Sequence, residues 1–163
     1  MTAGGSSIPE IQSLLATLAV GKRCAEAGTA YGEGAFAIAK TARSLVTVEN
    51  DENRAEIAKA RLRGLRNVEL IVGDWHDALP PKGPFELLFL DSGGFKQAPF
   101  EEGPLAIELL APGGMLVIDD LTPGREGHDP AREFLLGHSE LVAAELMTTV
   151  RSSAIVAVRR DRR

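Results

Sequence analysis

The sequence predicts an α/β fold in three layers, with a mostly parallel sheet between two layers of helices. After one initial helix, strand and helix patterns alternate along the 163 residues, as in sheets built from strand–helix–strand units. A glycine-rich turn at 28–34 joins a short apolar strand to a helix. The last two strand patterns are separated by only a short turn, which makes them antiparallel. These observations predict a Rossmann-like, seven-stranded sheet that ends in an antiparallel strand pair.

Composition excludes several classes of function. The chain has a net charge of −5 and one cysteine, Cys24. No overall positive field therefore attracts nucleic acid, and no disulfide can form within the chain. No apolar run approaches the roughly 20 residues needed to cross a bilayer, and no signal peptide is visible. We expect one cytoplasmic domain over residues 1–163, with flexible ends at 1–6 and 160–163 and with neither membrane nor nucleic-acid partners.

The first half of the chain divides into alternating elements. Ser7 and Glu10 have the spacing of a capping box, which predicts a helix that begins at Ser7 and ends before Gly21. Asn50 and Asp51 are helix-capping residue types, and Gly64 is a helix stop. The remaining expected elements are a strand at 23–27, a helix through Lys40, a strand at 44–49, a helix to about Arg63 and a strand at 67–72.

The second half continues the alternation. A proline-rich break at 80–84 precedes a strand at 85–90, whose apolar run is typical of a central strand covered on both faces. The remaining expected elements are a loop at 92–94, a helix at about 99–110, a turn at 112–114, a strand at 115–118, a loop at 122–130, a helix to about Leu136, and strands at about 141–147 and 153–159.

The glycine-rich turn predicts a nucleotide site. Glycines at positions 28, 32 and 34 let the backbone approach a ligand closely. The helix that follows directs unpaired N–H groups into the same turn. In open α/β sheets, ligands bind beyond the carboxyl ends of the strands, where this turn is expected to lie.

Five carboxylates fall at the ends of predicted strands. Because these ends share one edge of a parallel sheet, we expect the carboxylates to converge around the glycine turn. Glu49 at the tip of the second strand suits the two hydroxyls of a ribose. Glu26 would repel a pyrophosphate and suit a cationic ligand such as S-adenosylmethionine. The five residues are Glu26, Glu49, Asp74, Asp91 and Asp119.

Two other nucleotide-binding classes fit less well. The spacing of the glycines is also that of short-chain dehydrogenases, which use NAD and need a Tyr-x-x-x-Lys pair. The single tyrosine, Tyr31, has no lysine four residues later, so no acid for nicotinamide chemistry is visible. No phosphate-binding Gly-x-x-x-x-Gly-Lys-Ser/Thr loop is present, which disfavours a nucleoside triphosphatase.

From about Ile8 to Gly124, the chain resembles class I S-adenosylmethionine-dependent methyltransferases. More narrowly, it is similar to cation-dependent O-methyltransferases of the catechol and caffeoyl-coenzyme A type. The motifs that carry the resemblance are Glu26-Ala-Gly-Thr-x-x-Gly32, Glu49, Gly73-Asp74-Trp75, Phe89-Leu-Asp91 and Leu110–Asp120. The resemblance implies S-adenosylmethionine as cofactor and a small hydroxylated acceptor. The implied cofactor-binding residues are Glu26, Ala27, Gly28, Thr29, Gly32, Gly34, Glu49, Asn50, Gly73, Asp74, Trp75 and Asp91.

The resemblance also implies a metal site. In the family, an Asp after the fourth strand and an Asp-Asn pair after the fifth hold a divalent cation. Asp91, Asp119 and Asp120 occupy these positions, with Asp120 in place of the asparagine. Oxygen ligands suit Mg²⁺, Ca²⁺ or Mn²⁺. Asp91 and Lys96 are the implied catalytic residues, and Lys96 reaches the register of the family's basic lysine if two residues are inserted at 92–94.

Departures from the family leave alternatives open. Family members usually carry helices ahead of the one that starts near Ser7, so the acceptor site is expected to be open or completed by a partner chain, for example in a homodimer. A serine that often helps to hold the cofactor's carboxylate is replaced by Gly34. The alternative functions are a catalytically silent S-adenosylmethionine-binding module and, less well supported, the dehydrogenase. His76 is interpreted as a structural residue and Trp75 equally as a core or an adenine-contacting residue.

Overall fold

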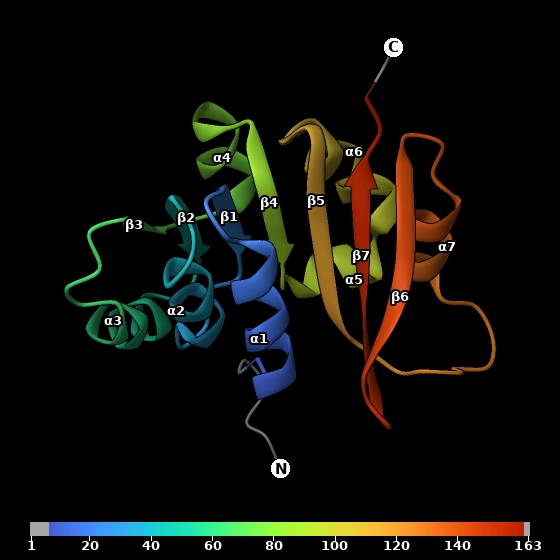
Figure 1. Ribbon diagram of the computed structural model, residues 1–163, viewed down its shortest axis with the longest axis horizontal. Helices are drawn as coiled ribbons and strands as arrows, with labels where there is room; N and C mark the ends of the chain where they lie inside the picture. Colours follow the sequence, from blue (N-terminus) through green and yellow to red (C-terminus); the bar gives the residue numbers. More distant parts are fainter. Residues whose placement is uncertain (1–6, 162–163) are drawn as a thin grey trace.

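The computed structural model describes residues 7–161 and shows one seven-stranded sheet with the strand order β3-β2-β1-β4-β5-β7-β6 (Figure 1). β1 to β5 run parallel, whereas β7 is antiparallel to both β5 and β6. The predicted fold class is confirmed. The strands are β1 (Arg23–Ala27), β2 (Ser44–Glu49), β3 (Val68–Val72), β4 (Phe85–Leu90), β5 (Leu110–Leu121), β6 (Leu141–Thr149) and β7 (Ser152–Arg159).

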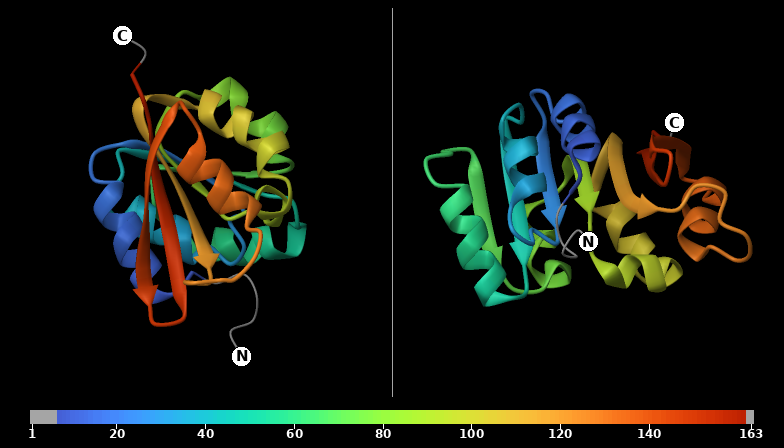
Figure 2. Two further views of the ribbon diagram at one scale, coloured as in Figure 1. Left: turned by 90° about the vertical axis from the view of Figure 1, so that its right-hand side faces the viewer. Right: turned by 90° about the horizontal axis from the view of Figure 1, so that it is seen from below.

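Helices cover both faces of the sheet (Figures 1 and 2). One apolar core joins α1, α2 and the end of α3 to one face, and a second core joins α4, α5, α6 and α7 to the other. β4 supplies both cores, which explains its uninterrupted apolar sequence. The helices are α1 (Pro9–Leu18), α2 (Glu33–Ala39), α3 (Glu52–Arg61), α4 (Trp75–Ala78), α5 (Gly93–Gln97), α6 (Pro99–Glu108) and α7 (Pro130–Gly137), with a 3-10 turn at Pro80–Lys82.

The predicted capping box at the start of α1 is wrong. The N-cap is Ile8 and the first helical residue is Pro9, whose fixed φ angle and missing N–H suit that position. Ser7 lies before the helix, where its carbonyl accepts a hydrogen bond from the Gln12 side chain at 2.7 Å. Proline therefore determines where the helix begins, and the hydroxyl does not cap it.

Two further segments differ from the sequence prediction. The expected loop at 92–94 instead leads into helix α5, which begins at Gly93. The expected turn at 112–114 lies within β5, because Leu110 pairs with Phe85 and Met115 pairs with Leu87. The residues between these two pairs bulge out of the ladder, so the strand bends locally without ending.

Flexible segments are expected at both ends of the chain. The expected flexible segment at 1–6 lies outside the described residues, as do residues 162–163 of the expected C-terminal one. At Arg160 the backbone N–H still donates to the Glu140 carbonyl at 2.8 Å. Among the described helices, none has both the length and the apolar character needed to cross a membrane.

Candidate active site

A cavity of about 600 Å³ opens at the carboxyl ends of the parallel strands. Its walls come from the turn after β1, the ends of β2 and β3, helix α4, the segment from β4 into α5 and the end of β5, together with one residue each of α3 and α6. This position agrees with the rule that ligands of open α/β sheets bind where the strand order reverses, here between β1 and β4.

Gly28 brings the wall after β1 against the end of β4. Its φ angle is +97°, and a side-chain Cβ at this position would lie 2.8 Å from the Asp91 carbonyl oxygen. Both features require glycine. Gly32 serves a different purpose, because a Cβ there would lie 3.2 Å from Ala58 Cα in α3. One glycine therefore shapes the cavity, whereas the other allows the start of α2 to pack against α3.

Glu49 is the acid that β2 presents to the cavity. The side chain is buried, and its two carboxylate oxygens accept backbone hydrogen bonds from Ala30 at 2.7 Å and from Asp51 at 3.0 Å. These two N–H groups fix the orientation of the carboxylate. The lone pairs that remain on each oxygen can accept hydrogen bonds from a ligand that carries two neighbouring hydroxyls.

Glu26 lies beneath the glycine turn and is not part of the cavity wall. Its carboxylate accepts a hydrogen bond from Thr47 Oγ1 at 2.5 Å, and Thr47 Oγ1 is 2.5 Å from Thr29 Oγ1. Gly34 leaves room for this carboxylate, since a Cβ there would collide with Glu26 Oε1. Burial raises the pKa of Glu26 to about 8, despite the hydrogen bond from Thr47.

A second group of polar residues lines the cavity beyond β3. Asp74 caps α4 and accepts hydrogen bonds from the backbone N–H of His76 at 2.9 Å and from its Nδ1 at 2.6 Å. These hydrogen bonds lower the pKa of Asp74. His76 stacks on Trp75 with ring centroids 4.0 Å apart, and its Nε2 lies 3.8 Å from Glu102 Oε1. Glu102 Oε2 is buried without a hydrogen-bond partner, so an acceptor is available to a ligand here.

Three carboxylates meet at the opposite side of the cavity. Asp91, Asp119 and Asp120 each present an oxygen within 4.8 Å of the others. The Lys96 ammonium lies among them, with Nζ 3.8 Å from Asp91 Oδ1, 3.7 Å from Asp119 Oδ1 and 3.5 Å from Asp120 Oδ2. Asp120 has a left-handed backbone with φ +56°, and α5 places Lys96 over the cluster.

Burial and mutual repulsion dominate the electrostatics of this cluster. Burial raises the pKa of Asp91, and the charge of Asp119 raises it further. Burial likewise raises the pKa of Asp119, with repulsion from Asp120 as the next cause. In both cases the Lys96 charge acts in the opposite direction. Asp119 is 2% exposed and its Oδ1 has no hydrogen-bond partner.

These residues fit a divalent cation. Three carboxylate oxygens match the preference of Mg²⁺, Ca²⁺ and Mn²⁺ for hard ligands. Asp119 Oδ1 is buried and accepts no hydrogen bond, with only the Lys96 ammonium 3.7 Å away, so a cation could satisfy this acceptor. One ammonium leaves two of the three negative charges uncompensated when all three acids are ionised.

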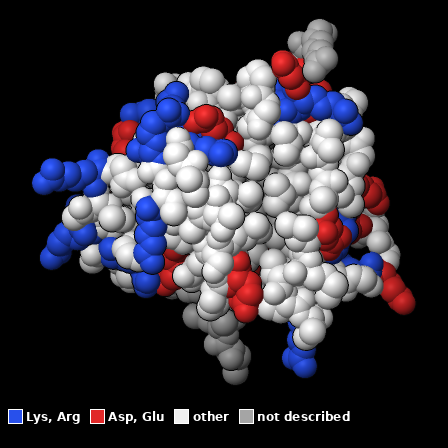
Figure 3. All heavy atoms as spheres, in the orientation of Figure 1, with Lys and Arg blue, Asp and Glu red and all other residues white. Residues whose placement is uncertain are grey.

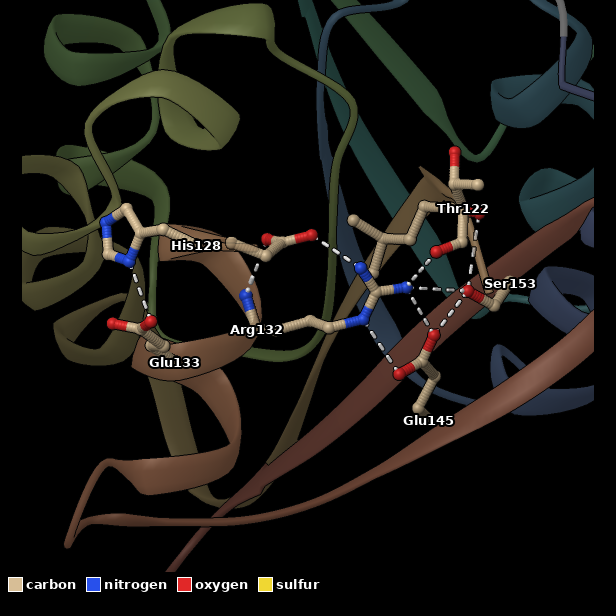
Figure 4. A network of polar contacts seen from close by, with 8 residues as sticks. Thr122, His128, Arg132, Glu133, Glu145 and Ser153 are labelled. Carbon is tan, nitrogen blue, oxygen red and sulfur yellow. Dashed lines mark hydrogen bonds and ion pairs between the residues drawn. The ribbon is translucent and has the colours of Figure 1, made fainter. Parts of the chain in front are cut away.

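Arg132 of α7 anchors the loop between β5 and α7. Its guanidinium donates hydrogen bonds to the Thr122 carbonyl at 2.7 Å and to both carboxylate oxygens of Glu145 at 2.6 and 2.9 Å (Figure 4). It also contacts Asp129 and Ser153. The network ties the segment that directly follows Asp119 and Asp120 to α7, β6 and β7.

The structure brings most, but not all, of the predicted site residues to one cavity. Glu26, Ala27, Thr29, Gly32, Gly34 and Asp119 are outside its wall, although Asp119 belongs to the carboxylate cluster. Glu102 lines the cavity and was missed, since an acid within a helix gives no signal in the sequence. His76, which the sequence analysis interprets as a structural residue, also lines the cavity. The predicted residues that line it are Gly28, Glu49, Asn50, Gly73, Asp74, Trp75, Asp91, Lys96 and Asp120.

Solved structures share this fold. An O-methyltransferase from Bacillus cereus, in complex with SAH, superposes with a TM-score of 0.79 at 22% identity over 97% of this chain and 84% of its own. The O-methyltransferase TomG from Streptomyces achromogenes, involved in tomaymycin synthesis and solved with SAM, gives a TM-score of 0.75 at 26% identity over 96% of this chain and 82% of its own.

Curated relatives match a shorter part of the chain. A protein-L-isoaspartate O-methyltransferase from Pyrococcus horikoshii is 36% identical over 107 residues, which are 64% of this chain and 46% of the relative. One from Azorhizobium caulinodans is 32% identical over 126 residues, or 75% of this chain and 54% of the relative. The chain thus spans about half the length of these relatives.

A family model described as a methyltransferase domain matches residues 25–121. This segment runs from β1 to the end of β5 and contains the glycine turn, Glu49 and the three clustered carboxylates. The match covers more than half of the chain and confirms the resemblance to class I methyltransferases. The chain therefore belongs to the methyltransferase-domain family.

Proposed function

We propose that this protein is an S-adenosylmethionine-dependent methyltransferase that methylates a hydroxyl oxygen of a small acceptor with the help of a divalent cation. The observation that carries the proposal is the continuous cavity between Glu49 and the cluster of Asp91, Asp119, Asp120 and Lys96. Near Glu49 the cavity offers hydrogen-bond acceptors for a ribose, and at the carboxylate cluster it offers a site where the hydroxyl of the methyl acceptor would be activated. The SAM and SAH complexes of the similar O-methyltransferases support this cofactor.

The cofactor is expected to extend along the cavity from Asp74 to Asp91. Glu49 would accept hydrogen bonds from the ribose hydroxyls because both its oxygens face fixed N–H groups and keep free lone pairs. Trp75, Asp74 and Glu102 would surround the adenine. Gly28 would leave the space in which the methionine portion passes the turn.

Methyl transfer requires the acceptor oxygen to lie in line with the bond between sulfur and the methyl carbon. The new oxygen–carbon bond forms as that bond breaks, which leaves S-adenosylhomocysteine and releases the hydroxyl proton. Asp91, Asp119 and Asp120 would hold a divalent cation, which when bound lowers the pKa of the hydroxyl and orients it. Lys96, after losing its own proton, would accept the hydroxyl proton at Nζ, and positioning supplies most of the remaining acceleration.

Cofactor binding is tested by calorimetric titration with S-adenosylhomocysteine, with NAD as the parallel titrant. We expect the first to bind and Glu49→Ala to weaken it at least tenfold, about 1.4 kcal/mol, because two hydrogen bonds to a carboxylate are lost. Asn67→Ala, at the opposite end of the strands, is the control for the fold. Binding of NAD alone would overturn the proposal in favour of the dehydrogenase.

Transfer is tested with S-adenosylmethionine labelled in its methyl group and a panel of catechols and related phenols. We expect turnover that requires Mg²⁺ or Mn²⁺ and that is lost in Asp119→Asn. Activity that persists in Asp91→Ala and Asp119→Ala and resists chelators would refute the metal mechanism. Cofactor binding without turnover on any acceptor would favour the silent binding module.

A second candidate function is methylation of a protein carboxyl group, which the protein-L-isoaspartate O-methyltransferases suggest by their similarity. The charge of the cavity argues against it, since an acceptor carboxylate would approach Asp91, Asp119 and Asp120. An isoaspartyl peptide in the same labelling assay decides between the two. Faster labelling of the peptide than of every phenol would favour the carboxyl reaction.

A further inference from the structure

We propose that the groove between α3 and the free edge of β3 binds an acidic segment of another protein, which joins the sheet as an added strand. The groove has a volume of about 550 Å³ and shares no lining residue with the cavity that contains Glu49 and the carboxylate cluster. It lies at the end of the sheet formed by β3, whereas the cavity opens where the strand order reverses. It is therefore a second site, and its role does not depend on methyl transfer.

The backbone of β3 is free along its outer edge. Among the described residues, β3 pairs with β2 and with no other strand. The Asn67 carbonyl and the Gly73 N–H are both directed toward β2, where they form hydrogen bonds of 2.8 and 2.9 Å. Successive residues of a strand direct their backbone groups to alternate edges, so Val68, Leu70 and Val72 direct theirs away from β2. An added strand would find its hydrogen-bonding partners on these three residues.

The same three residues form the apolar floor of the groove. Side chains at every second position of a strand lie on one face of the sheet, and Val68, Leu70 and Val72 all line the groove. Leu62 and Leu65, which follow the last turns of α3, line it as well. The helix covers this face only in part, since Val72 is still 51% exposed. The row of apolar side chains would receive every second side chain of an added strand, as in other complexes formed by strand addition.

The charge around the groove favours an acidic partner. From Arg54 to Arg66 the chain has five Lys or Arg residues and one acid, so this segment carries a net charge of +4 in a chain of net charge −5. Lys and Arg side chains gather on the left of Figure 3, where Figure 1 places α3 and β3. Lys59 and Arg63 line the groove itself. An acidic segment would be attracted here and repelled by the acidic remainder of the chain.

The cations of the groove are available to a partner. Arg63 is exposed, and its guanidinium forms no hydrogen bond or ion pair with another described residue. Lys59 is paired with Glu56 at 3.5 Å, but both side chains are at least 70% exposed, so this pair is weak. Glu69 lies on the opposite face of β3, where it pairs with Lys82 at 2.7 Å. The one acid of the strand therefore does not oppose an acidic partner in the groove.

Other occupants fit these features less well. If a second copy of the chain paired through β3, the two-fold axis would place both α3 helices side by side on one face of the sheet, and their cations would repel each other. A nucleic acid would contact the cations but would leave the apolar floor unused. An extended acidic segment with apolar residues at alternate positions uses the cations, the floor and the free backbone together.

The first test titrates the full chain into a fluorescent peptide that alternates glutamate and valine, with fluorescence anisotropy as the readout. We expect binding that weakens at least tenfold in the double variant Lys59→Glu/Arg63→Glu, because attraction becomes repulsion at two positions. The matched control is Arg125→Glu/Arg151→Glu, which changes the net charge equally at two exposed positions outside the groove. Its affinity should equal that of the wild type, and a peptide that alternates lysine and valine should not bind.

Three outcomes of this titration would overturn the proposal. They are absence of binding, equal binding of the two peptides, and equal losses of affinity in the two double variants. Vesicles of phosphatidylglycerol and an oligouridylate are titrated in parallel. If either bound more tightly than the glutamate–valine peptide and lost its binding in Lys59→Glu/Arg63→Glu, the groove would be a lipid or nucleic-acid site instead.

The second test examines strand addition by amide hydrogen exchange, followed by nuclear magnetic resonance with and without a saturating amount of the glutamate–valine peptide. The N–H groups of Val68, Leu70 and Val72 should exchange more slowly when the peptide is bound, because the peptide accepts their hydrogen bonds. Those of Glu69 and Ile71 are directed toward β2 and should change much less. Bound peptide without this alternating protection would refute strand addition.

Discussion

Replacing Lys96 by methionine should make the protein bind Mn²⁺ more tightly. Its ammonium lies 3.5–3.8 Å from oxygens of three carboxylates, in the position that the cation itself would take. The Lys96 ammonium therefore competes with the cation for the same carboxylate oxygens. Methionine keeps most of the length and apolar contacts of the side chain while it removes the charge.

The size of the effect follows from the distances. At 3.7 Å, opposite unit charges attract by about 1 kcal/mol even at the dielectric constant of water, and by several times more in a partly buried site. Displacing Lys96 from three carboxylates thus costs about 3 kcal/mol. Its side chain is 25% exposed and can swing into solvent, which we expect to halve this cost to about 1.5 kcal/mol, or tenfold in affinity.

The measurement is a titration of Mn²⁺ by calorimetry or by electron paramagnetic resonance, which needs neither cofactor nor acceptor. Lys40→Met is the matched control, because Lys40 lies over the Phe36 ring at 4.6 Å and far from the cluster in sequence. Affinity equal to or weaker than that of the wild type in Lys96→Met would refute the competition. Absence of Mn²⁺ binding in both proteins would instead refute the metal site.

Three further predictions concern stability. Gly28→Ala should lower the free energy of unfolding by about 2 kcal/mol or more, because of backbone strain and the contact with the Asp91 carbonyl. The control is Gly113→Ala, which has the same backbone strain from a positive φ but no neighbouring atoms. Equal losses of stability for the two variants in urea unfolding would contradict the close contact at Gly28. Without ligand, the free energy of unfolding should fall by on the order of 4 kcal/mol as pH rises from about 4.5 to 8, because folded Glu26 retains a proton that the unfolded chain releases. Parallel profiles of stability against pH for the wild type and Glu26→Gln would disprove this. Arg132→Ala should cost about 2–3 kcal/mol by leaving partly buried carboxylates unpaired, and a melting temperature equal to that of exposed Arg43→Ala would count against it.

Much of the fold was predictable because apolar periodicity and turn residues reflect local rules. β1, β2 and β4 have the expected bounds, and α3 is capped by Asp51 as expected. The failures lie where two local rules compete. At the start of α1, Pro9 overrides the hydroxyl of Ser7, and within β5 pairing with β4 continues past a Pro-Gly-Gly sequence that elsewhere would end a strand.

The direction of each acid was less predictable than its position. Glu26 has the same parity along β1 as Cys24, which faces the core under α1 and α2, so alternation alone directs its side chain away from the cavity. Glu49 escapes this constraint because it ends β2 and is held by N–H groups from two separate segments. Parity within the strand does not separate the two, since Glu49 shares the parity of Leu45, which packs in the same core as Cys24. The difference is that Glu26 lies inside β1 under the glycine turn, whereas Glu49 stands at the end of its strand.

The carboxylate cluster depends on backbone conformations that are difficult to predict from the sequence. Lys96 reaches it because the residues after Asp91 form α5, which absorbs the extra length that a loop would have left unconstrained. Asp120 reaches it through a left-handed backbone, a conformation that few residues other than glycine, asparagine and aspartate adopt. Since asparagine and aspartate both tolerate this backbone, the asparagine expected here from the resemblance to cation-dependent O-methyltransferases would fit the same geometry without the third charge. The third carboxylate then has a direct electrostatic consequence: it holds Lys96 in the cluster at the shortest of the three distances, 3.5 Å, and so makes the lysine a stronger competitor for the cation than a two-carboxylate site would.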